Sequence, residues 1–278
     1  MILQQGGRTA TTKFVKTIDR STIENHCVIL YEYPFNERTR TYLRLEHLFR
    51  RFEKLVPSES ALSHHYALVT LFEIMEVAAR ADLKSDVLRD LEKHKMLFNS
   101  YRGNPAIAEA ALDRIVAQLE RNFAALNAVS GKIGSTLNGN EWLMSIRSRV
   151  GIPAGTCEFD LPAYSAWQHR SGSARRADLV RWVATLSPLA EAIYLLLKLL
   201  RDTDVPCKVI AVGGQFQQTL PQGRTFHLVR LRIDPGLGAI PEISGNRLLV
   251  AVRMMKQTPD DRLQPNTEDT PFELTLCA

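Results

Sequence analysis

Arginine is concentrated in one predicted helix near the start of the chain. After Asn36, apolar residues recur at three- and four-residue intervals, which indicates an amphipathic helix. At about 100° per residue, four of its basic side chains fall within one narrow arc beside the apolar stripe. They are Arg40, Arg44, His47 and Arg51. Guanidinium groups hold carboxylates with paired hydrogen bonds, so the arc is suited to an acidic ligand; the alternative is a solvated surface, which lysine would serve equally well.

A second group of basic and aromatic residues follows the central predicted helices. Its members are Arg147, Arg149, Trp167, His169 and Arg170. Aromatic and basic side chains together are typical of a peptide groove, in which an anchor fills a pocket and charges fix the orientation. Taken singly, Trp167 is also consistent with core packing, and His169 with an ordinary surface histidine.

Motifs that identify enzymes and metal sites are missing from the sequence. It has no nucleophile elbow, no zinc-binding His-Glu-x-x-His helix and no phosphate-binding loop. The four cysteines are widely separated and are interpreted as reduced thiols. We expect no catalytic residues, no metal and no cofactor. A hydrolase using a histidine and carboxylates of the strand-rich part stays as an alternative, although spacing assembles no nucleophile, base and orienting group.

Composition indicates a globular protein of 278 residues with 45% hydrophobic and 23% charged residues. The longest apolar stretch, 186–200, is interrupted by charges and is shorter than the roughly 20 residues of a membrane span. The start lacks the pattern of a secretory signal, so we expect a cytoplasmic protein without a membrane span. The net charge of +5 does not by itself imply nucleic acid. A basic nucleic-acid-binding protein nevertheless stays as an alternative, although recognised motifs are missing.

The order of elements predicts an α+β fold, with helices first and strands afterwards. We expect a flexible extension over 1–26, and then a helical domain over 27–204 with about eight helices and a strand at its start. Asn104 is predicted to cap a helix over 105–130. A small antiparallel β domain is expected over 205–278, with strands at 208–220, 226–234, 247–255 and 272–276. The segments around Cys27 and Cys157 are expected to join these strands.

Several blocks of the sequence resemble one known family. The run LYEYPFNERTRTYLRLE at 30–46 resembles the opening of the Z-ring-associated protein D (ZapD) family. Later blocks follow in the family's order: IPAGTCEFDLP at 152–162, Trp167, PEISG at 241–245 and FEL at 272–274. The resemblance extends from about residue 28 to the C-terminus, and separate blocks in register are more specific than any one of them.

The resemblance implies a non-enzymatic bacterial division factor, a homodimer with a helical domain and a small β domain. Such proteins bind the C-terminal tail of FtsZ, the tubulin-like protein of the midcell division ring, and bundle its filaments. Basic family positions match Arg40, Arg44, Arg147 and Arg149, whereas Glu141 and Ser165 stand where the family has two others. The tail-binding residues predicted from pattern and resemblance together are Arg40, Arg44, Arg51, Arg147, Arg149, Trp167, His169 and Arg170.

Overall fold

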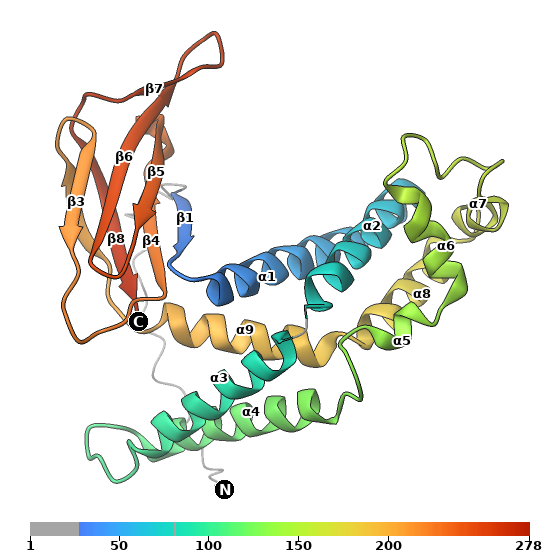
Figure 1. The fold of residues 1–278 in the computed structure, drawn as a ribbon, viewed down its shortest axis with the longest axis horizontal. Coiled ribbons are helices and arrows are strands. Elements are labelled where there is room, and N and C mark those ends of the chain that lie inside the picture. Colours follow the sequence, from blue (N-terminus) through green and yellow to red (C-terminus); the bar gives the residue numbers. More distant parts are fainter. Residues whose placement is uncertain (1–27, 81) are drawn as a thin grey trace, which may run out of the picture.

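A helical region and a β region meet at an angle. The computed structural model describes residues 28–80 and 82–278, so the extension predicted over 1–26 and Cys27 lie outside the described residues. Helices come first along the chain and antiparallel strands follow, which confirms the predicted α+β class. In Figure 1 the β region and the far end of the helical region form the two arms of an open V.

The described residues contain nine α-helices, one more than the eight or so predicted. They are α1 (Glu37–Leu55), α2 (Ala61–Ala78), α3 (Leu83–Asn99), α4 (Glu109–Ala128), α5 (Ser135–Asn138), α6 (Glu141–Val150), α7 (Pro162–Gln168), α8 (Gly172–Ala184) and α9 (Ser187–Arg201). Asn36 caps α1, because its side-chain oxygen accepts a hydrogen bond from the Thr39 backbone N–H at 2.8 Å. The prediction for Asn104 is wrong. Its side chain accepts from the Ala106 N–H in a local turn, and α4 begins only at Glu109.

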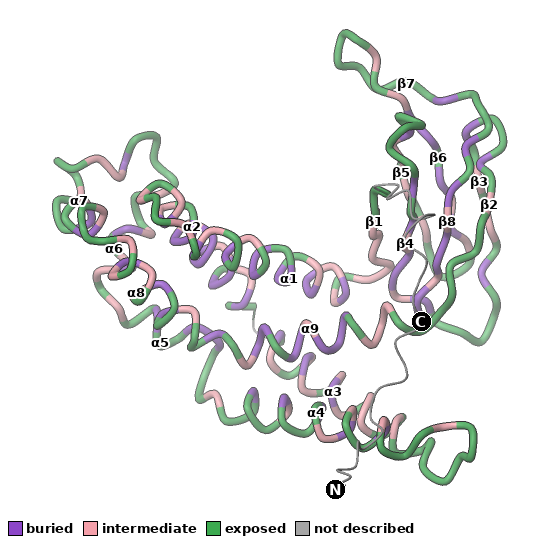
Figure 2. The backbone as a smooth tube through the Cα atoms, turned by 180° about the vertical axis from the view of Figure 1, so that it is seen from behind, coloured by how far each residue is buried: buried purple, intermediate pink, exposed green. Residues whose placement is uncertain are grey.

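The last helix, α9, is the centre of the helical core. It packs against α1, α3 and α4, and Leu189, Ile193 and Leu197 on its apolar face are fully buried. Figure 2 shows buried residues following α9 and the inner strands of the β region. Among the described residues no single helix is long and apolar enough to cross a membrane; only α8 and α9 together, across a 68° bend, reach that length and composition.

Two antiparallel sheets enclose the core of the β region. Their strands are β1 (Ile29–Pro34), β2 (Cys207–Ala211), β3 (Gln215–Thr219), β4 (Leu228–Ile233), β5 (Ala239–Gly245), β6 (Leu249–Gln257), β7 (Leu263–Pro265) and β8 (Thr270–Cys277). One sheet has the order β1-β4-β8-β2, and the other β3-β6-β5 with β7 beside β6. Val229 and Leu231 of the first sheet share one core with Val250 and Val252 of the second. In β4 arginines interrupt the apolar residues, and Arg232 is exposed to solvent.

Two predictions about the strands were wrong, and one strand was not predicted. The predicted strand 208–220 is two strands in different sheets, because Gly213 and Gly214 adopt φ angles of 55° and 75° and turn the chain. The sequence did not reveal β5, which contains Pro241; proline is tolerated there because β5 is an edge strand. The segment around Cys157 joins neither sheet and forms a hydrogen-bonded loop between α6 and α7.

The first strand connects the two regions. The sequence predicted a strand at the start of the helical domain and predicted that the segment around Cys27 joins the later strands. The described part of that segment confirms this, because β1 pairs with β4, with Tyr31 opposite Leu231. Glu32 of β1 accepts hydrogen bonds from Arg230 of β4 at 3.0 Å and from Arg201 of α9 at 2.8 Å. Because α1 begins three residues after β1 ends, this anchoring fixes the start of the arginine-rich helix against the β region.

Candidate functional site

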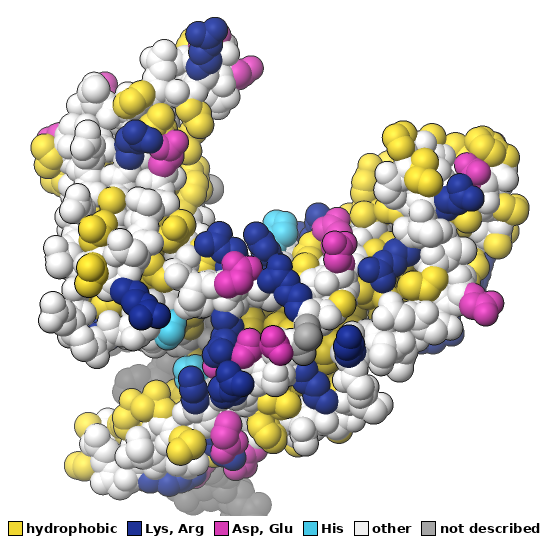
Figure 3. All heavy atoms as spheres, in the orientation of Figure 1, with side chains coloured by type: hydrophobic (Ala, Val, Ile, Leu, Met, Phe, Trp, Pro, Cys, Tyr) yellow, Lys and Arg dark blue, Asp and Glu magenta, His cyan; other side chains and the backbone are white. Residues whose placement is uncertain are grey.

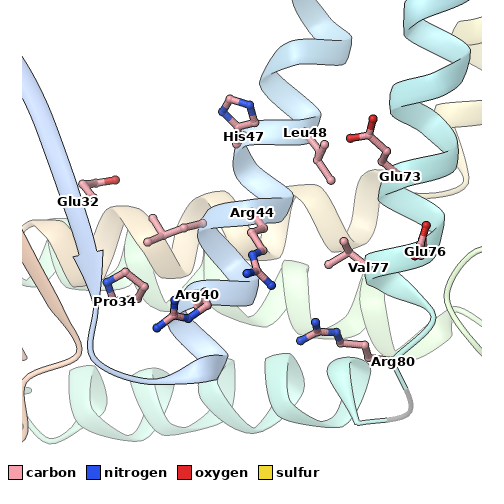
Figure 4. Close-up of a pocket in the computed structure, with 11 residues that line it drawn as sticks. Glu32, Pro34, Arg40, Arg44, His47, Leu48, Glu73, Glu76, Val77 and Arg80 are labelled. Carbon is pink, nitrogen blue, oxygen red and sulfur yellow. The ribbon is translucent and has the colours of Figure 1, made fainter. Parts of the chain in front are cut away.

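A groove of about 700 Å³ lies where β1, α1 and the end of α2 meet. Figure 3 shows Lys and Arg side chains gathered in this hollow, between the two arms of the molecule. Three arginines converge in it, Arg40 and Arg44 from α1 and Arg80 from just after α2 (Figure 4). The remaining lining residues are Glu32, Pro34, Leu43, His47, Leu48, Glu73, Glu76 and Val77.

One carboxylate lies among the three arginines of the groove. Glu37, in the first turn of α1, accepts a hydrogen bond from Arg80 Nη1 at 3.1 Å. Its carboxylate oxygens lie 3.2 Å from Arg40 Nε and 3.9 Å from Arg44 Nη1. The hydrogen bond from Arg80, together with the nearby charges of Arg40 and Arg44, holds the pKa of Glu37 below its ordinary value. These three arginines therefore pair with one shared carboxylate, which concentrates positive charge at this end of the groove, although Glu32, Glu73 and Glu76 also line it.

Arg40 is incompletely satisfied within this cluster. Its Nε atom is buried and, within the described residues, has no hydrogen-bond partner. The 3.2 Å separation from Glu37 is an ion pair in distance, but its angles do not make a hydrogen bond. A buried donor without an acceptor is costly, so a carboxylate that displaced Glu37 and reached this atom would gain a hydrogen bond.

The groove also offers apolar surface. Leu43 and Leu48 of α1 and Val77 of α2 line it, and Pro34 contributes from the end of β1. Leu48 is buried, while Leu43 and Val77 are partly buried against the helical core. Aliphatic side chains beside converging guanidinium groups suit a peptide that carries both carboxylates and aliphatic residues.

Other arginines of α1 are already engaged elsewhere. Arg51 donates to Thr70 Oγ1 at 2.9 Å and to Glu73 Oε2 at 2.5 Å, and it does not line the groove. Arg38 binds Asp86 and Asp90 of α3 on another side of the helix. The structure therefore brings Arg40, Arg44 and His47 of the predicted arc into the groove and leaves Arg51 beside it.

The second predicted group lies at the other end of the helical region, on α6 and α7. Arg147 and Arg149 are in the last turn of α6, and neither forms an ion pair with any described residue. Arg147 Nη1 donates a hydrogen bond to the side-chain oxygen of Asn138 at 3.3 Å. Two arginines without acidic partners leave an uncompensated positive surface at the end of α6. Glu141 lies at the start of α6 and Ser165 lies in α7.

The structure separates Trp167 from this positive surface. Its side chain is 5% exposed and packs with Trp142, Tyr164 and Trp182, with ring centroids 5.6 to 6.2 Å apart. The indole N–H donates to Asp178 at 3.0 Å. Trp167 is therefore a member of the helical core, and its ring is not available to a ligand.

His169 and Arg170 are exposed just beyond the end of α7. His169 Nδ1 lies 2.8 Å from the backbone oxygen of Ser165. Arg170 donates to Asp178 Oδ2 at 2.7 Å, so its charge is already paired. Of the second group, Arg147 and Arg149 are the residues whose charges no described carboxylate neutralises.

Some residues of these surfaces were not predicted from the sequence. Val77 lies in α2 and Arg80 just after it, and nothing in their local pattern connects them to α1; only the packing of α1 against α2 brings them to the groove. The loop before α7 presents Ile152 and Phe159, with Phe159 79% exposed. The exposed aromatic residue of this part of the molecule is therefore Phe159 and not Trp167.

Comparison with known proteins gives one consistent result. A sequence model of the ZapD family, described as a cell division protein, matches residues 43–253. The chain is 51% identical over 251 residues to the cell division protein ZapD of Ralstonia nicotianae, covering 90% of this chain and 99% of the relative. Identity to the protein of the same name is 50% in Ralstonia pickettii, over 90% of this chain and 99% of the relative. Identity to the protein of the same name in a Janthinobacterium species is 49%, over 90% of this chain and 100% of the relative.

The matched segments include most of the groove. The family match begins within α1 at residue 43 and extends through α2, α6 and α7 into β6. The relatives are matched over nearly their whole length, so the likeness concerns the complete fold and not one motif. The chain belongs to the ZapD family of cell division proteins.

Proposed function

We propose that this protein is a non-catalytic division factor that binds the C-terminal tail of FtsZ and bundles FtsZ filaments at the midcell ring in the cytoplasm. The observation that carries the proposal is the groove in which Arg40, Arg44 and Arg80 share one carboxylate beside an aliphatic wall. A flexible tail segment with carboxylates and aliphatic side chains matches both features. The carboxylates bind the guanidinium groups, while the aliphatic residues pack on Leu43, Leu48 and Val77.

Each tail binds weakly in this proposal. An exposed ion pair contributes only about 0.2 to 1 kcal/mol, and the groove arginines are half exposed. A homodimer carries two copies of the groove and thus crosslinks two filaments. Because a filament displays many tails, multivalent attachment raises the apparent affinity by roughly 10² to 10⁴ without new contacts. Bundling is then strong while each single contact exchanges rapidly.

The positive surface of α6 is a second contact for the same partner. Arg147 and Arg149 have no acidic partner among the described residues, and Ile152 next to them is 48% exposed. We assign this surface to acidic stretches of the tail beyond the segment held in the groove. The surface lies on the helical arm away from β1, so one extended tail segment would follow the helical region from the groove to α6.

Co-sedimentation with FtsZ filaments tests the proposal directly. Filaments of full-length FtsZ should pellet with the protein and form bundles at low speed, whereas filaments lacking the C-terminal tail should do neither. Equal pelleting with both kinds of filament would overturn tail recognition. A gel-shift titration with DNA and RNA at moderate salt distinguishes the nucleic-acid alternative, which requires a shift that is absent in our proposal.

A further inference from the structure

Glu37 occupies the position in which a bound carboxylate is expected. It is a side-chain carboxylate 62% exposed to solvent, and its oxygens lie 3.1 Å from Arg80 Nη1, 3.2 Å from Arg40 Nε and 3.9 Å from Arg44 Nη1. A tail carboxylate that enters the groove needs these same guanidinium groups. Glu37 and the ligand therefore compete for one set of hydrogen-bond donors.

The contacts of Glu37 are too imperfect to make it a purely structural residue. Among the described residues only Arg80 donates a side-chain hydrogen bond to it, and the Arg40 Nε–H has no acceptor there. A guanidinium group has five N–H donors, so three arginines offer far more than one carboxylate accepts. A ligand carboxylate with better geometry can form hydrogen bonds with the arginine N–H groups that Glu37 does not use.

We propose that Glu37 is an internal competitor that sets the affinity and the specificity of the groove for acidic peptides. The inference rests on the proposed function, since it concerns the same groove. When a peptide binds, its carboxylate takes the place of Glu37 beside Arg40 and Arg44, and the exposed Glu37 side chain turns into solvent. A ligand with a single carboxylate only exchanges one ion pair for another and gains little. A segment with several carboxylates, or an array of tails on a filament, displaces Glu37 with a net gain.

A glutamate that lines the groove supplies a matched control. Glu76 of α2 is one of the lining residues, and among the described residues it forms no ion pair with the three arginines. Replacing Glu37 or Glu76 by glutamine removes one negative charge at or beside the groove with almost no change of side-chain volume. If the effect of Glu37 were only its contribution to the net charge, the two variants would behave alike.

The experiment is a titration of wild type, Glu37→Gln and Glu76→Gln with two labelled peptides, the FtsZ C-terminal tail and a short poly-glutamate, read by fluorescence anisotropy. Circular dichroism verifies that all three proteins are folded. Glu37→Gln should bind both peptides about two- to fivefold more tightly than wild type. This factor corresponds to one exposed ion pair that the peptide no longer has to break. Glu76→Gln should show a smaller gain, that of the lost charge alone.

The outcomes separate this inference from the proposed function. The proposal that Glu37 competes with the ligand is overturned if Glu37→Gln binds the peptides no more tightly than wild type, or if both variants gain the same affinity. This holds even if the tail binds wild type well. If only Glu37→Gln gains affinity for poly-glutamate and none of the proteins binds the tail, the result supports Glu37 as a competitor and overturns FtsZ as the partner. Absence of binding to both peptides overturns both.

Discussion

Arg201 and Glu46 form a two-pronged ion pair between α9 and α1. Arg201 Nη1 lies 2.8 Å from Glu46 Oε1, and Nη2 lies 2.6 Å from Oε2. The same guanidinium group also binds both oxygens of Glu32 on β1, at 2.8 and 2.7 Å. The Arg201 and Glu46 side chains are 16% and 8% exposed, so the pair is largely removed from solvent. One arginine thereby fixes α1 and β1, two walls of the groove, to the central helix.

Removal of Arg201 should strongly destabilise the protein. Arg201→Met keeps much of the side-chain volume but leaves Glu32 and Glu46 largely buried and short of a cation. Breaking a buried pair from one side costs about 3 to 5 kcal/mol; because Arg201 retains some exposure and Arg50 and Arg230 remain, we expect about 3 kcal/mol. Urea unfolding followed by circular dichroism measures it. The control is Arg232→Met, whose 3.6 Å pair with Glu273 is exposed and should cost under about 1 kcal/mol. Similar losses in both variants would contradict the role given to Arg201.

Acid should weaken the same junction. Burial alone would raise the pKa of Glu46, but the hydrogen bond and charge of Arg201, together with Arg50, outweigh it and lower the pKa below the ordinary value of 4.5. A lowered folded-state pKa stabilises the protein above the unfolded-state value, and this stability is lost as the pH falls through the folded-state value. Glu46→Gln should therefore be less stable than wild type at pH 7, and the difference should shrink below about pH 4.5. Urea midpoints over that range measure the difference; a constant difference would count against the ionised pair.

Charge reversal in the groove should abolish bundling without unfolding the protein. Arg40→Glu with Arg44→Glu replaces two guanidinium groups by carboxylates that repel an acidic tail. Light scattering and co-sedimentation with FtsZ should fall to background, while the helical circular-dichroism signal persists. Two reversals made on the exposed surface away from the groove, Arg247→Glu with Arg262→Glu, supply the matched control for net charge and should retain bundling. Bundling by the groove variant would exclude this site.

Salt should weaken tail binding by wild type. Exposed charges are screened over about 8 to 10 Å near physiological ionic strength, so the dissociation constant for the tail should rise steadily as salt is added. Anisotropy titrations of the labelled tail at several salt concentrations measure the slope, which should be shallower in Arg80→Ala because one groove cation is gone. A flat response in wild type would mean that aliphatic contacts alone hold the tail.

Truncation of two aromatic residues that are close in sequence should change the free energy of unfolding by very different amounts. Trp167→Ala empties a site in the aromatic cluster and should cost about 3 to 5 kcal/mol. Phe159→Ala removes a side chain that is 79% exposed and should change the free energy of unfolding by less than about 0.5 kcal/mol. Thermal and urea unfolding measure both. The milder Trp167→Phe should fold and still bundle filaments. Loss of bundling in this folded variant would instead support a role of Trp167 in binding the partner.

Local sequence was sufficient where short-range interactions decide the structure. The cap at Asn36 depends on a side chain three residues from its partner, and the alternation of β4 depends on a period of two, so both could be predicted. The prediction failed where an equally local signal had two solutions. Asn104 can cap a helix or close a turn, and the pair Gly213–Gly214 can bulge within a strand or end it.

The site divides in the same way. The basic arc of α1 with Arg40 and Arg44 could be predicted from the chain, because helical geometry fixes which residues share a face. Helix packing was needed to place Arg80 in the groove, to set Glu37 among its arginines and to bury Trp167. These facts depend on which helices pack together, and contacts between residues tens of positions apart follow no local period. The chain alone thus specified the charge of a surface, and packing specified which of its charges remain available to a partner.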